Sequence, residues 1–405
     1  MRLGSRRLGS SEPFVTTKEW LAHDPLRRDR SDGIDVLRAI FALWVVLAHL
    51  VPWSVLAHGP DAVPHWIAEL ADLIQRVFQP IGELHPAVVA FIVLSGYCIH
   101  RAGLRAPGTG EIAGYAIRRF FRIMPLYYLA IAVGLVGFLA ASRHAPKLAV
   151  AMSGTEAISG ACIAAKAVVL SAFWPGWYEC GFLGNAPLAT VVVEIVLYIL
   201  YGTVFAALVW RGREPIIWLA CAGLFLFSLA MLGIGVGPHF YGWWQNGSIF
   251  GFLPYWWLGV LFVNPRFASE CRRRWWLIAA VWVILTTLLL LWPPPGVQAI
   301  AELRKLSFAL LTGVLIAAAD TVRVRPLAAL APVGRAGYGL YALHAPLTYT
   351  LIVYGVAWWI VLFANVVAGL LVHWTIERPL VDLGRTLRNR LAPRTIAAAP
   401  IRAMR

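Results

Sequence analysis

Charged residues are scarce in this sequence. Asp, Glu, Lys and Arg make up only 14% of its 405 residues, whereas 60% are hydrophobic. Soluble domains carry about 25% charged and 45–50% apolar residues, so this composition excludes a soluble globular protein. At roughly 20 residues per crossing, the chain has room for about ten membrane helices and little else. We therefore expect an all-α, polytopic membrane helical bundle at 34–380, flanked by basic tails at 1–33 and 381–405.

Cysteine is also rare. The five cysteines form no CxxC pair and show no metal-ligand spacing, so the sequence indicates neither a metal site nor a cysteine nucleophile. Cys98 and Cys221 fall in apolar runs and are expected to be inert core residues. Cys162 and Cys180 fall in a long external loop predicted at 142–187, and the sequence leaves open whether they form a disulfide.

Acidic residues are fewer than basic ones, 20 against 35, which gives a net charge of +15. The positive-inside rule accounts for this excess in a membrane protein, so we expect no nucleic-acid partner. A second use for the charge is to hold an anionic, phosphate-bearing substrate. Residues 1–33 have no apolar core and are therefore not expected to be a cleavable signal peptide. The lack of an internal repeat weakens the case for a transporter built from two inverted halves.

Ten apolar runs predict the membrane helices. They cover 36–57, 82–100, 122–141, 188–209, 215–236, 248–263, 275–292, 303–320, 336–355 and 357–376. If the N-terminus is cytoplasmic, only six of the 35 basic residues fall on the outside: Arg76, Arg143, Lys147, Lys166, Arg304 and Lys305. Because Lys and Arg gather in cytoplasmic connections, this asymmetry predicts that both termini are cytoplasmic.

The pair Arg38 and His49 is the strongest local feature, because both residues lie in one apolar stretch at 33–50. An ionisable group at the centre of a membrane helix costs roughly 2.5–3.5 kcal/mol on insertion scales, so such groups are rare without a function. Their spacing corresponds to about three helical turns, which places both side chains on one face about 16 Å apart. A cation near one surface and a proton-handling group deeper on the same stripe would suit an acyl-transfer site. The alternative is a buried histidine that a neighbouring helix satisfies.

Arg119 and Arg122 lie one turn apart at the start of the third predicted helix. Two guanidinium groups at the cytoplasmic surface could hold the phosphates of a nucleotide-bearing donor in a bidentate manner. The alternative is an anchor for lipid headgroups at a helix end.

Glu194 lies two turns into the fourth predicted helix, within an apolar run. A carboxyl group there must be paired or protonated. We expect it to orient and charge-stabilise His49, as a carboxylate does for a catalytic histidine. The alternative is a structural partner for a buried arginine.

Tyr338, Tyr341 and His344 recur every three residues in the ninth predicted helix and share a face. They predict a polar stripe inside the bundle. One or more of them could instead only satisfy buried hydrogen bonds.

Taken in their order along the chain, these motifs resemble those of the acyltransferase-3 family of integral membrane acyltransferases. The resemblance extends from about residue 34 to 383. The chain departs from the family pattern at 187–190, where Pro-Leu-Ala-Thr replaces the tryptophan and serines usual before the acidic motif. The matching segments are Asp35, Arg38 and His49; 91–97 with Ser95 and Tyr97; 119–125; Glu194 with Tyr198; 338–346; and 377–379.

The resemblance implies an acyl-CoA-dependent O-acyltransferase. It would move an acyl group, acetyl being the expected one, from cytoplasmic acyl-CoA to a hydroxyl of an extracytoplasmic glycan, glycolipid (lipid-linked sugar) or small molecule. His49 would be the base with Glu194 as its catalytic partner, and Arg38, Arg119 and Arg122 would bind acyl-CoA. The supporting polar stripe would comprise Asp35, Ser95, Tyr97, Tyr198, Tyr338, Tyr341 and His344.

No metal and no tightly bound cofactor are expected, and the implied location is the bacterial inner (plasma) membrane, among membrane lipids. The alternative class is a proton-coupled transporter or flippase for a glycan or small molecule, in which the same buried charges form a substrate path. The acceptor, the acyl group, the oligomeric state and the role of the long external loop stay open.

Overall fold

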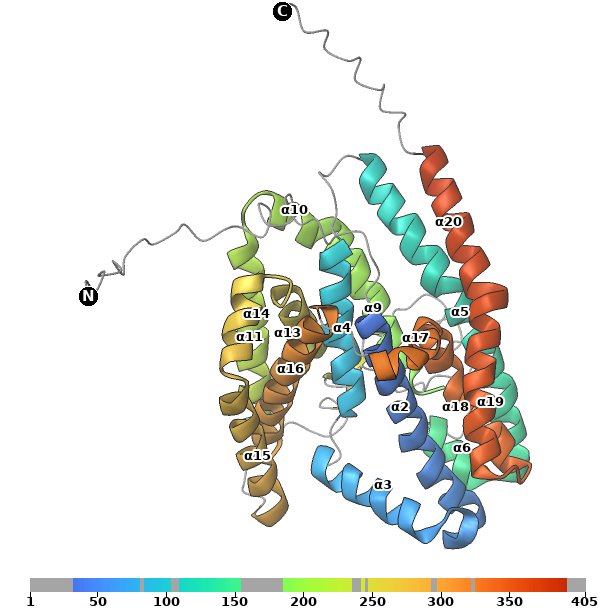
Figure 1. Cartoon of the computed structure of the whole chain (residues 1–405). Helices are drawn as coiled ribbons and strands as arrows, with labels where there is room; N and C mark the ends of the chain where they lie inside the picture. Colours follow the sequence, from blue (N-terminus) through green and yellow to red (C-terminus); the bar gives the residue numbers. More distant parts are fainter. Residues whose placement is uncertain are drawn as a thin grey trace, which may run out of the picture.

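The computed structural model describes residues 32–80, 84–102, 109–153, 185–234, 242–244, 247–292, 297–321 and 325–391, and these are helical apart from short turns (Figure 1). Cys162, Cys180 and most of the predicted external loop lie outside the described residues. The elements are α2 (Asp32–His58), η2 (Pro60–Ala62), α3 (His65–Phe78), α4 (Pro86–Ala102), α5 (Thr109–His144), α6 (Pro146–Ser153), α9 (Leu188–Leu200), η4 (Tyr201–Phe205), α10 (Ala206–Trp210), α11 (Glu214–Gly233), α13 (Ile249–Leu261), α14 (Pro265–Arg273), α15 (Trp275–Leu291), α16 (Val297–Thr321), η5 (Arg325–Leu330), α17 (Ala331–Arg335), α18 (Gly337–Val353), α19 (Trp358–Val372), η6 (His373–Glu377) and α20 (Arg378–Leu391).

Five helical stretches in the described part of the chain are long and apolar enough to cross a membrane. These are Asp32–His58, Ile112–His144, Leu188–Trp210, Glu214–Gly233 and Trp358–Arg390. Helices α4 and α15 are apolar but only 17 residues long. The all-α membrane class is thus confirmed, whereas the expected ten crossings go beyond what helix length and composition show.

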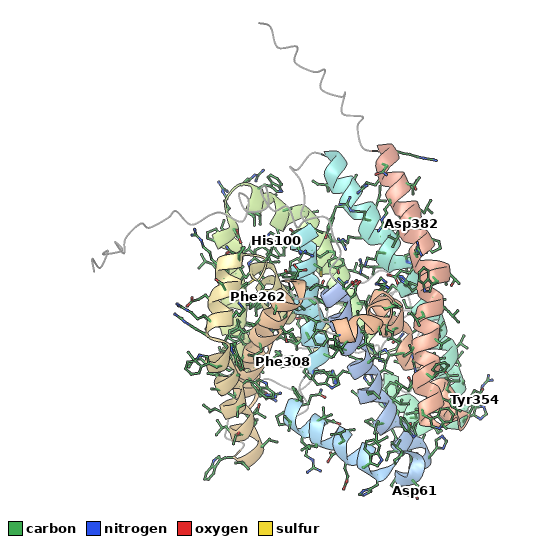
Figure 2. The ribbon with its side chains drawn as sticks, in the orientation of Figure 1. Asp61, His100, Phe262, Phe308, Tyr354 and Asp382 are labelled. Atoms are coloured by element: carbon green, nitrogen blue, oxygen red, sulfur yellow. The ribbon has the colours of Figure 1, made fainter. Side chains whose placement is uncertain are left out.

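The bundle has two distinct ends (Figure 2). His100 on α4 and Asp382 on α20 lie towards one end, and Asp61 and Tyr354 lie towards the other. Helix α20 packs along α5 at the first of these ends, so the segment predicted as the start of a tail at residue 381 is helical as far as Leu391. At the opposite end α3 runs across the bundle, with Trp66 and Leu73 exposed.

Helices α4 and α13 pack with their backbones in direct contact. A Cβ atom at Gly96 would overlap the carbonyl of Trp256, and one at Gly259 would overlap the carbonyl of Val93. Only glycine permits so close an approach of two helices. This contact fixes the height of Ser95, next to Gly96, against Trp256.

Helix α17 approaches α2 equally closely. A Cβ atom at Gly334 would overlap the backbone carbonyl of Asp35. The contact brings Arg335, the last residue of α17, to the same part of the bundle as Arg38 on α2. Two arginines that are almost 300 positions apart in the chain therefore face one space.

Helix α18 contains Pro346, which has no N–H and so cannot bond the carbonyl of Ala342, four residues earlier. The side-chain amide of Asn185 donates to that carbonyl instead, at 2.8 Å. Asn185 is fully buried and also donates to the carbonyl of Ala130 on α5, at 3.3 Å. One side chain thereby joins the start of α9 to α5 and α18, which positions the stripe of α18 that contains Tyr341 and His344.

Candidate functional site

A cavity with about 860 Å³ of empty space lies between α2, α4, α5, α9 and the α17–α18 pair. We call it the arginine cavity, because Arg38, Arg119, Arg122 and Arg335 line it together with a single carboxylate, Glu194. Eight of the twelve residues predicted for the site line it: Arg38, Ser95, Arg119, Arg122, Glu194, Tyr198, Tyr338 and Tyr341.

Arg38 is fixed at one wall of the cavity by two contacts. Its guanidinium donates to Oδ1 of Asp35 at 2.6 Å and to Sγ of Cys98 at 3.1 Å. Asp35 is fully buried behind Arg38, so its role is to orient the arginine and offset its charge. Cys98, expected to be an inert core residue, also lines the cavity.

Glu194 is held by hydroxyl groups. Ser95 Oγ donates to Oε1 of Glu194 at 2.7 Å, and the Tyr198 hydroxyl donates to the same oxygen. The indole Nε1 of Trp256 donates in turn to Ser95 Oγ at 3.2 Å. Sequence reasoning paired Glu194 with His49, but the structure gives the two residues different partners. The pairing could not be read from spacing, because it depends on which faces of α9 and α4 meet.

Arg119 lies between two aromatic rings, with its guanidinium carbon 5.5 Å from the ring centre of Tyr115 and 5.4 Å from that of Tyr198. Its Nε is buried and has no hydrogen-bond partner among the described residues. The cation–π contacts and a hydrogen bond with Tyr115 hold the planar group in one orientation. Of the four guanidinium groups, Arg38 pairs with Asp35 and Arg335 lies 4.0 Å from Asp32. With Glu194 counted as well, the cavity keeps an excess of positive charge, which suits an anionic ligand.

Two aromatic rings in the cavity lining pack against each other. Phe91 and Tyr341 both line it and meet edge to face, with ring centres 5.5 Å apart. The Tyr341 hydroxyl lies 2.5 Å from Oγ1 of Thr190 and 3.3 Å from the carbonyl of Pro187. The segment 187–190, where the chain departs from the family pattern, thus anchors Tyr341. We call Phe91 and Tyr341 the aromatic partition.

His49 and His344 form a pair on the far side of Tyr341. Nδ1 of His49 lies 2.9 Å from Nε2 of His344, and Nδ1 of His344 lies 2.7 Å from the Tyr341 carbonyl. Within the described residues, neither histidine belongs to the lining of the arginine cavity. The predicted donor-binding arginines and the predicted base therefore belong to two neighbouring parts of the site, and Tyr341, which lines the cavity, has its ring centre 5.7 Å from that of His344.

The remaining predicted residues divide between the cavity and its surroundings. Tyr338 lines the cavity, and its hydroxyl donates to the carbonyl of Ile123 at 3.1 Å. Tyr97 instead donates to Oδ2 of Asp320 at 2.8 Å, and Arg101 pairs with the same oxygen at 3.0 Å. Tyr97 thus belongs to a neighbouring contact between α4 and α16.

Sequence reasoning missed Arg335 and His85 as site residues. Arg335 lines the cavity, and the glycine one position before it, at the close contact with α2, was the available signal. His85 lies just before α4, where its Nδ1 accepts the backbone N–H of Ala87 at 3.2 Å. It interacts electrostatically with His49 and His344. Its position directly before a proline and an apolar run was the only signal for it.

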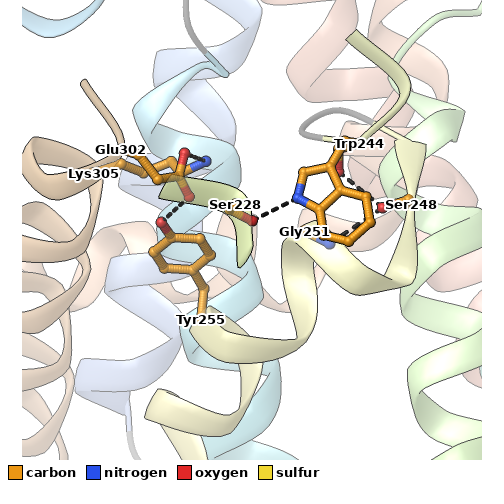
Figure 3. A network of polar contacts seen from close by, with 7 residues as sticks. All are labelled: Ser228, Trp244, Ser248, Gly251, Tyr255, Glu302 and Lys305. Carbon is orange, nitrogen blue, oxygen red and sulfur yellow. Dashed lines mark hydrogen bonds and ion pairs between the residues drawn. The ribbon is translucent and has the colours of Figure 1, made fainter. Parts of the chain in front are cut away.

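A second buried polar cluster lies between α13 and α16 (Figure 3). Lys305 pairs with Glu302 at 2.6 Å, and Tyr255 donates to the other carboxylate oxygen of Glu302. We call these three residues the lysine network. Lys305 and its neighbour Arg304 were assigned to the outside by charge counting, yet they are only 7 and 4% exposed. Among the described residues, no group of three or more His, Cys, Asp or Glu side chains could hold a metal ion.

A family model described as an acyltransferase domain matches residues 31–378. Searches of curated proteins and of solved structures found no match. The match covers the motifs on which the resemblance rested, from Asp35 to Arg378 within the last segment, and confirms it. Since it spans nearly the whole membrane part of the chain, the protein belongs to the acyltransferase-3 family.

Proposed function

We propose that this protein transfers an acyl group, acetyl being the expected one, from cytoplasmic acyl-CoA to a hydroxyl of an extracytoplasmic glycan, glycolipid or small molecule. The arginine cavity would bind the donor, and His49 would be the general base for the acceptor. The reaction needs no metal and no tightly bound cofactor.

One observation carries the proposal: an excess of guanidinium groups lines a cavity inside an apolar bundle, and Tyr341 of that lining bonds through its carbonyl to the histidine pair. Acyl-CoA is a phosphate-bearing anion, and arginine binds phosphate oxygens through paired N–H donors. An alcohol needs a base that titrates near neutrality, and imidazole is the side chain of that type. The arginine cavity and the histidine pair thus match the two tasks of an acyl-transfer reaction, which are binding of the donor and removal of a proton from the acceptor.

In the transfer step, His49 would take the proton of the acceptor hydroxyl while the hydroxyl oxygen attacks the thioester carbonyl carbon. The new C–O ester bond forms, the C–S bond breaks, and CoA leaves as a thiolate that takes up a proton. The donor carbonyl must pass the aromatic partition to reach the acceptor, so we expect the Tyr341 and Phe91 rings to separate during turnover. Arg38, which faces the cavity from the same helix as His49, would contact the donor closest to the reacting atoms.

Glu194 would act on the donor side of the partition. Its carboxylate is bonded by Ser95 and Tyr198, and Tyr198 also contacts Arg119. We therefore propose that Glu194 orients the arginines of the cavity and does not charge-stabilise His49 directly.

The proposal includes a topology. Ten crossings with both termini in the cytoplasm would place the arginine cavity at the cytoplasmic side and the histidine pair nearer the outside, in the inner (plasma) membrane of a bacterium. The distribution of Lys and Arg in the sequence supports this orientation. So does the position of Arg38, which precedes His49 on α2, the first helix of the described residues.

The direct test is free CoA release from labelled acetyl-CoA by the purified protein in detergent, supplied with an envelope glycan and lipid extract as acceptor. We expect His49→Ala to lower turnover by about 100-fold or more, because a positioned base contributes about 10²–10⁴-fold. His58→Ala is the matched control, since His58 lies on the same helix and bonds the carbonyl of Ile352. It should retain wild-type turnover.

Mass spectrometry of envelope glycans from cells with and without the protein would then name the acyl group by its mass. Full activity of His49→Ala would remove His49 from the chemistry. Flux of a glycan without consumption of acetyl-CoA would replace the proposal with the transporter or flippase alternative.

A further inference from the structure

The two rings of the histidine pair meet edge to edge. Their centres are 5.1 Å apart and their planes differ by 28°, so the 2.9 Å contact between Nδ1 of His49 and Nε2 of His344 lies close to both ring planes. This is the geometry of an in-plane hydrogen bond, in which one nitrogen must donate and the other must accept. The direction of the bond decides which nitrogen of His49 holds a proton.

The direction follows from the next bond along the chain of contacts. Nδ1 of His344 lies 2.7 Å from the backbone carbonyl of Tyr341, and a carbonyl oxygen can only accept. Nδ1 of His344 must therefore carry the proton, which leaves Nε2 of a neutral His344 as an acceptor. Nδ1 of His49 then has to be the donor between the rings.

A doubly protonated His344 would reverse the bond between the rings. His344 is fully buried, however, and its hydrogen-bond partners are the backbone carbonyls of Tyr341 and Leu340 and a second imidazole, with no carboxylate among them. A buried cation is costly unless a carboxylate pairs with it. The neutral arrangement is therefore the one that these contacts favour.

We propose that His344 is a positioning residue that holds the proton of His49 on Nδ1 and so presents Nε2 of His49 as the basic nitrogen. The inference rests on the proposed function of His49, and it adds which atom of that ring acts and what sets it. The aromatic partition takes part as well, because the Tyr341 backbone accepts the bond that starts the chain while its ring faces the arginine cavity.

The kinetic test compares two replacements of His344. His344→Leu keeps the bulk but offers no acceptor, and we expect turnover to fall by about 100-fold or more while KM for acetyl-CoA changes less than about threefold. In His344→Gln the side-chain carbonyl can accept from Nδ1 of His49, so about tenfold or more of the loss should return. Equal loss in both variants would overturn the inference.

His100→Leu is the matched control. His100 is buried on α4 and its Nδ1 contacts the Tyr201 hydroxyl at 2.8 Å, outside the histidine pair and the cavity lining. We expect His100→Leu to keep turnover within about threefold of wild type. This result would show that losing a buried histidine contact between helices does not by itself cause the loss expected in His344→Leu. A 100-fold loss of turnover in this control would indicate that His344 has only a structural role.

A spectroscopic measurement tests the proton position without any acyl transfer. The protein is labelled with ¹⁵N-histidine in lipid nanodiscs at neutral pH, and the two rings are assigned from spectra of His49→Gln and His344→Gln. We expect both rings to be neutral with the proton on Nδ1. A proton on Nε2 of His49 would overturn the inference even if the enzyme is active. If no variant, wild type included, releases CoA, the proposed function fails, while the spectrum still decides the arrangement of the pair.

Discussion

The arginine cavity and the lysine network are both buried and charged, but they are built in opposite ways. In the lysine network Lys305 pairs with Glu302, Tyr255 occupies the other carboxylate oxygen, and the ammonium group lies 4.9 Å from the Tyr255 ring centre. In the arginine cavity Arg38 and Arg335 pair with Asp35 and Asp32, whereas Arg119 and Arg122 have no ion pair among the described residues. The first set of charges is paired within the protein, whereas the second keeps an excess of positive charge, which under the proposed function an anionic donor would balance.

This difference separates structural from functional charge. Removing one partner of a closed buried pair leaves an uncompensated ion and destabilises the fold. Removing one cation from an open, like-charged group relieves repulsion and weakens ligand binding instead. Changes in the lysine network should therefore affect stability, and changes in the cavity should affect the affinity for the donor.

The largest effect is expected from Lys305→Met. It leaves the Glu302 carboxylate buried without its cation, which should lower the free energy of unfolding by about 3–5 kcal/mol. Thermal unfolding in detergent measures this, while turnover per folded molecule should not change. The double variant Lys305→Met with Glu302→Gln should recover most of the stability, because no charge remains. Normal stability with reduced turnover would show that the network belongs to the site.

Arg122→Ala should have the converse effect. Loss of a charge-assisted hydrogen bond to a phosphate is worth about 1.5–3 kcal/mol, so KM for acetyl-CoA should rise by about 10- to 100-fold. Thermal stability should stay within about 0.5 kcal/mol of wild type. Arg118→Ala is the matched control, because Arg118 lies on the same helix but not in the cavity lining. An equal rise in KM for both variants would point to general surface charge.

The smallest effect should come from Gly334→Ala. Gly334 lines the cavity and also forms the close contact between α17 and α2. Its new Cβ would press on the Asp35 carbonyl and push α17 from α2, at a cost of about 1–3 kcal/mol. The shift also displaces Arg335 relative to Arg38, so KM for the donor should rise together with the loss of stability. In Gly223→Ala, a helical position with open space around it, neither quantity should worsen. A stable Gly334→Ala variant would disprove the close contact.

Composition and apolar runs were enough to predict the membrane class, because a chain with 60% hydrophobic residues has more apolar surface than a soluble domain buries. The motifs also found most of the cavity lining, because polar residues in apolar runs are rare enough to be informative. Partners were not predictable: His49 contacts His344 across 295 positions, and Glu194 contacts Ser95 across 99. Such pairs depend on which helix faces meet, which spacing along one helix does not contain.

Charge counting failed where basic residues are buried. Arg304 and Lys305 were assigned to an outer connection, although Arg304 bonds the carbonyls of Val77 and Phe78 at the end of α3 and Lys305 pairs with Glu302. The positive-inside rule treats each Lys or Arg as facing water, so it cannot recognise cations that serve the interior.

The aromatic partition has a consequence for the cell that holds this protein. A water-filled passage from one face of an energised membrane to the other would carry protons and discharge the gradient. Phe91 and Tyr341 both line the space around the arginines, whereas His49 does not. If these rings part for each transfer event, as the proposed function expects, they would close the path between events and keep protons from leaking through the protein.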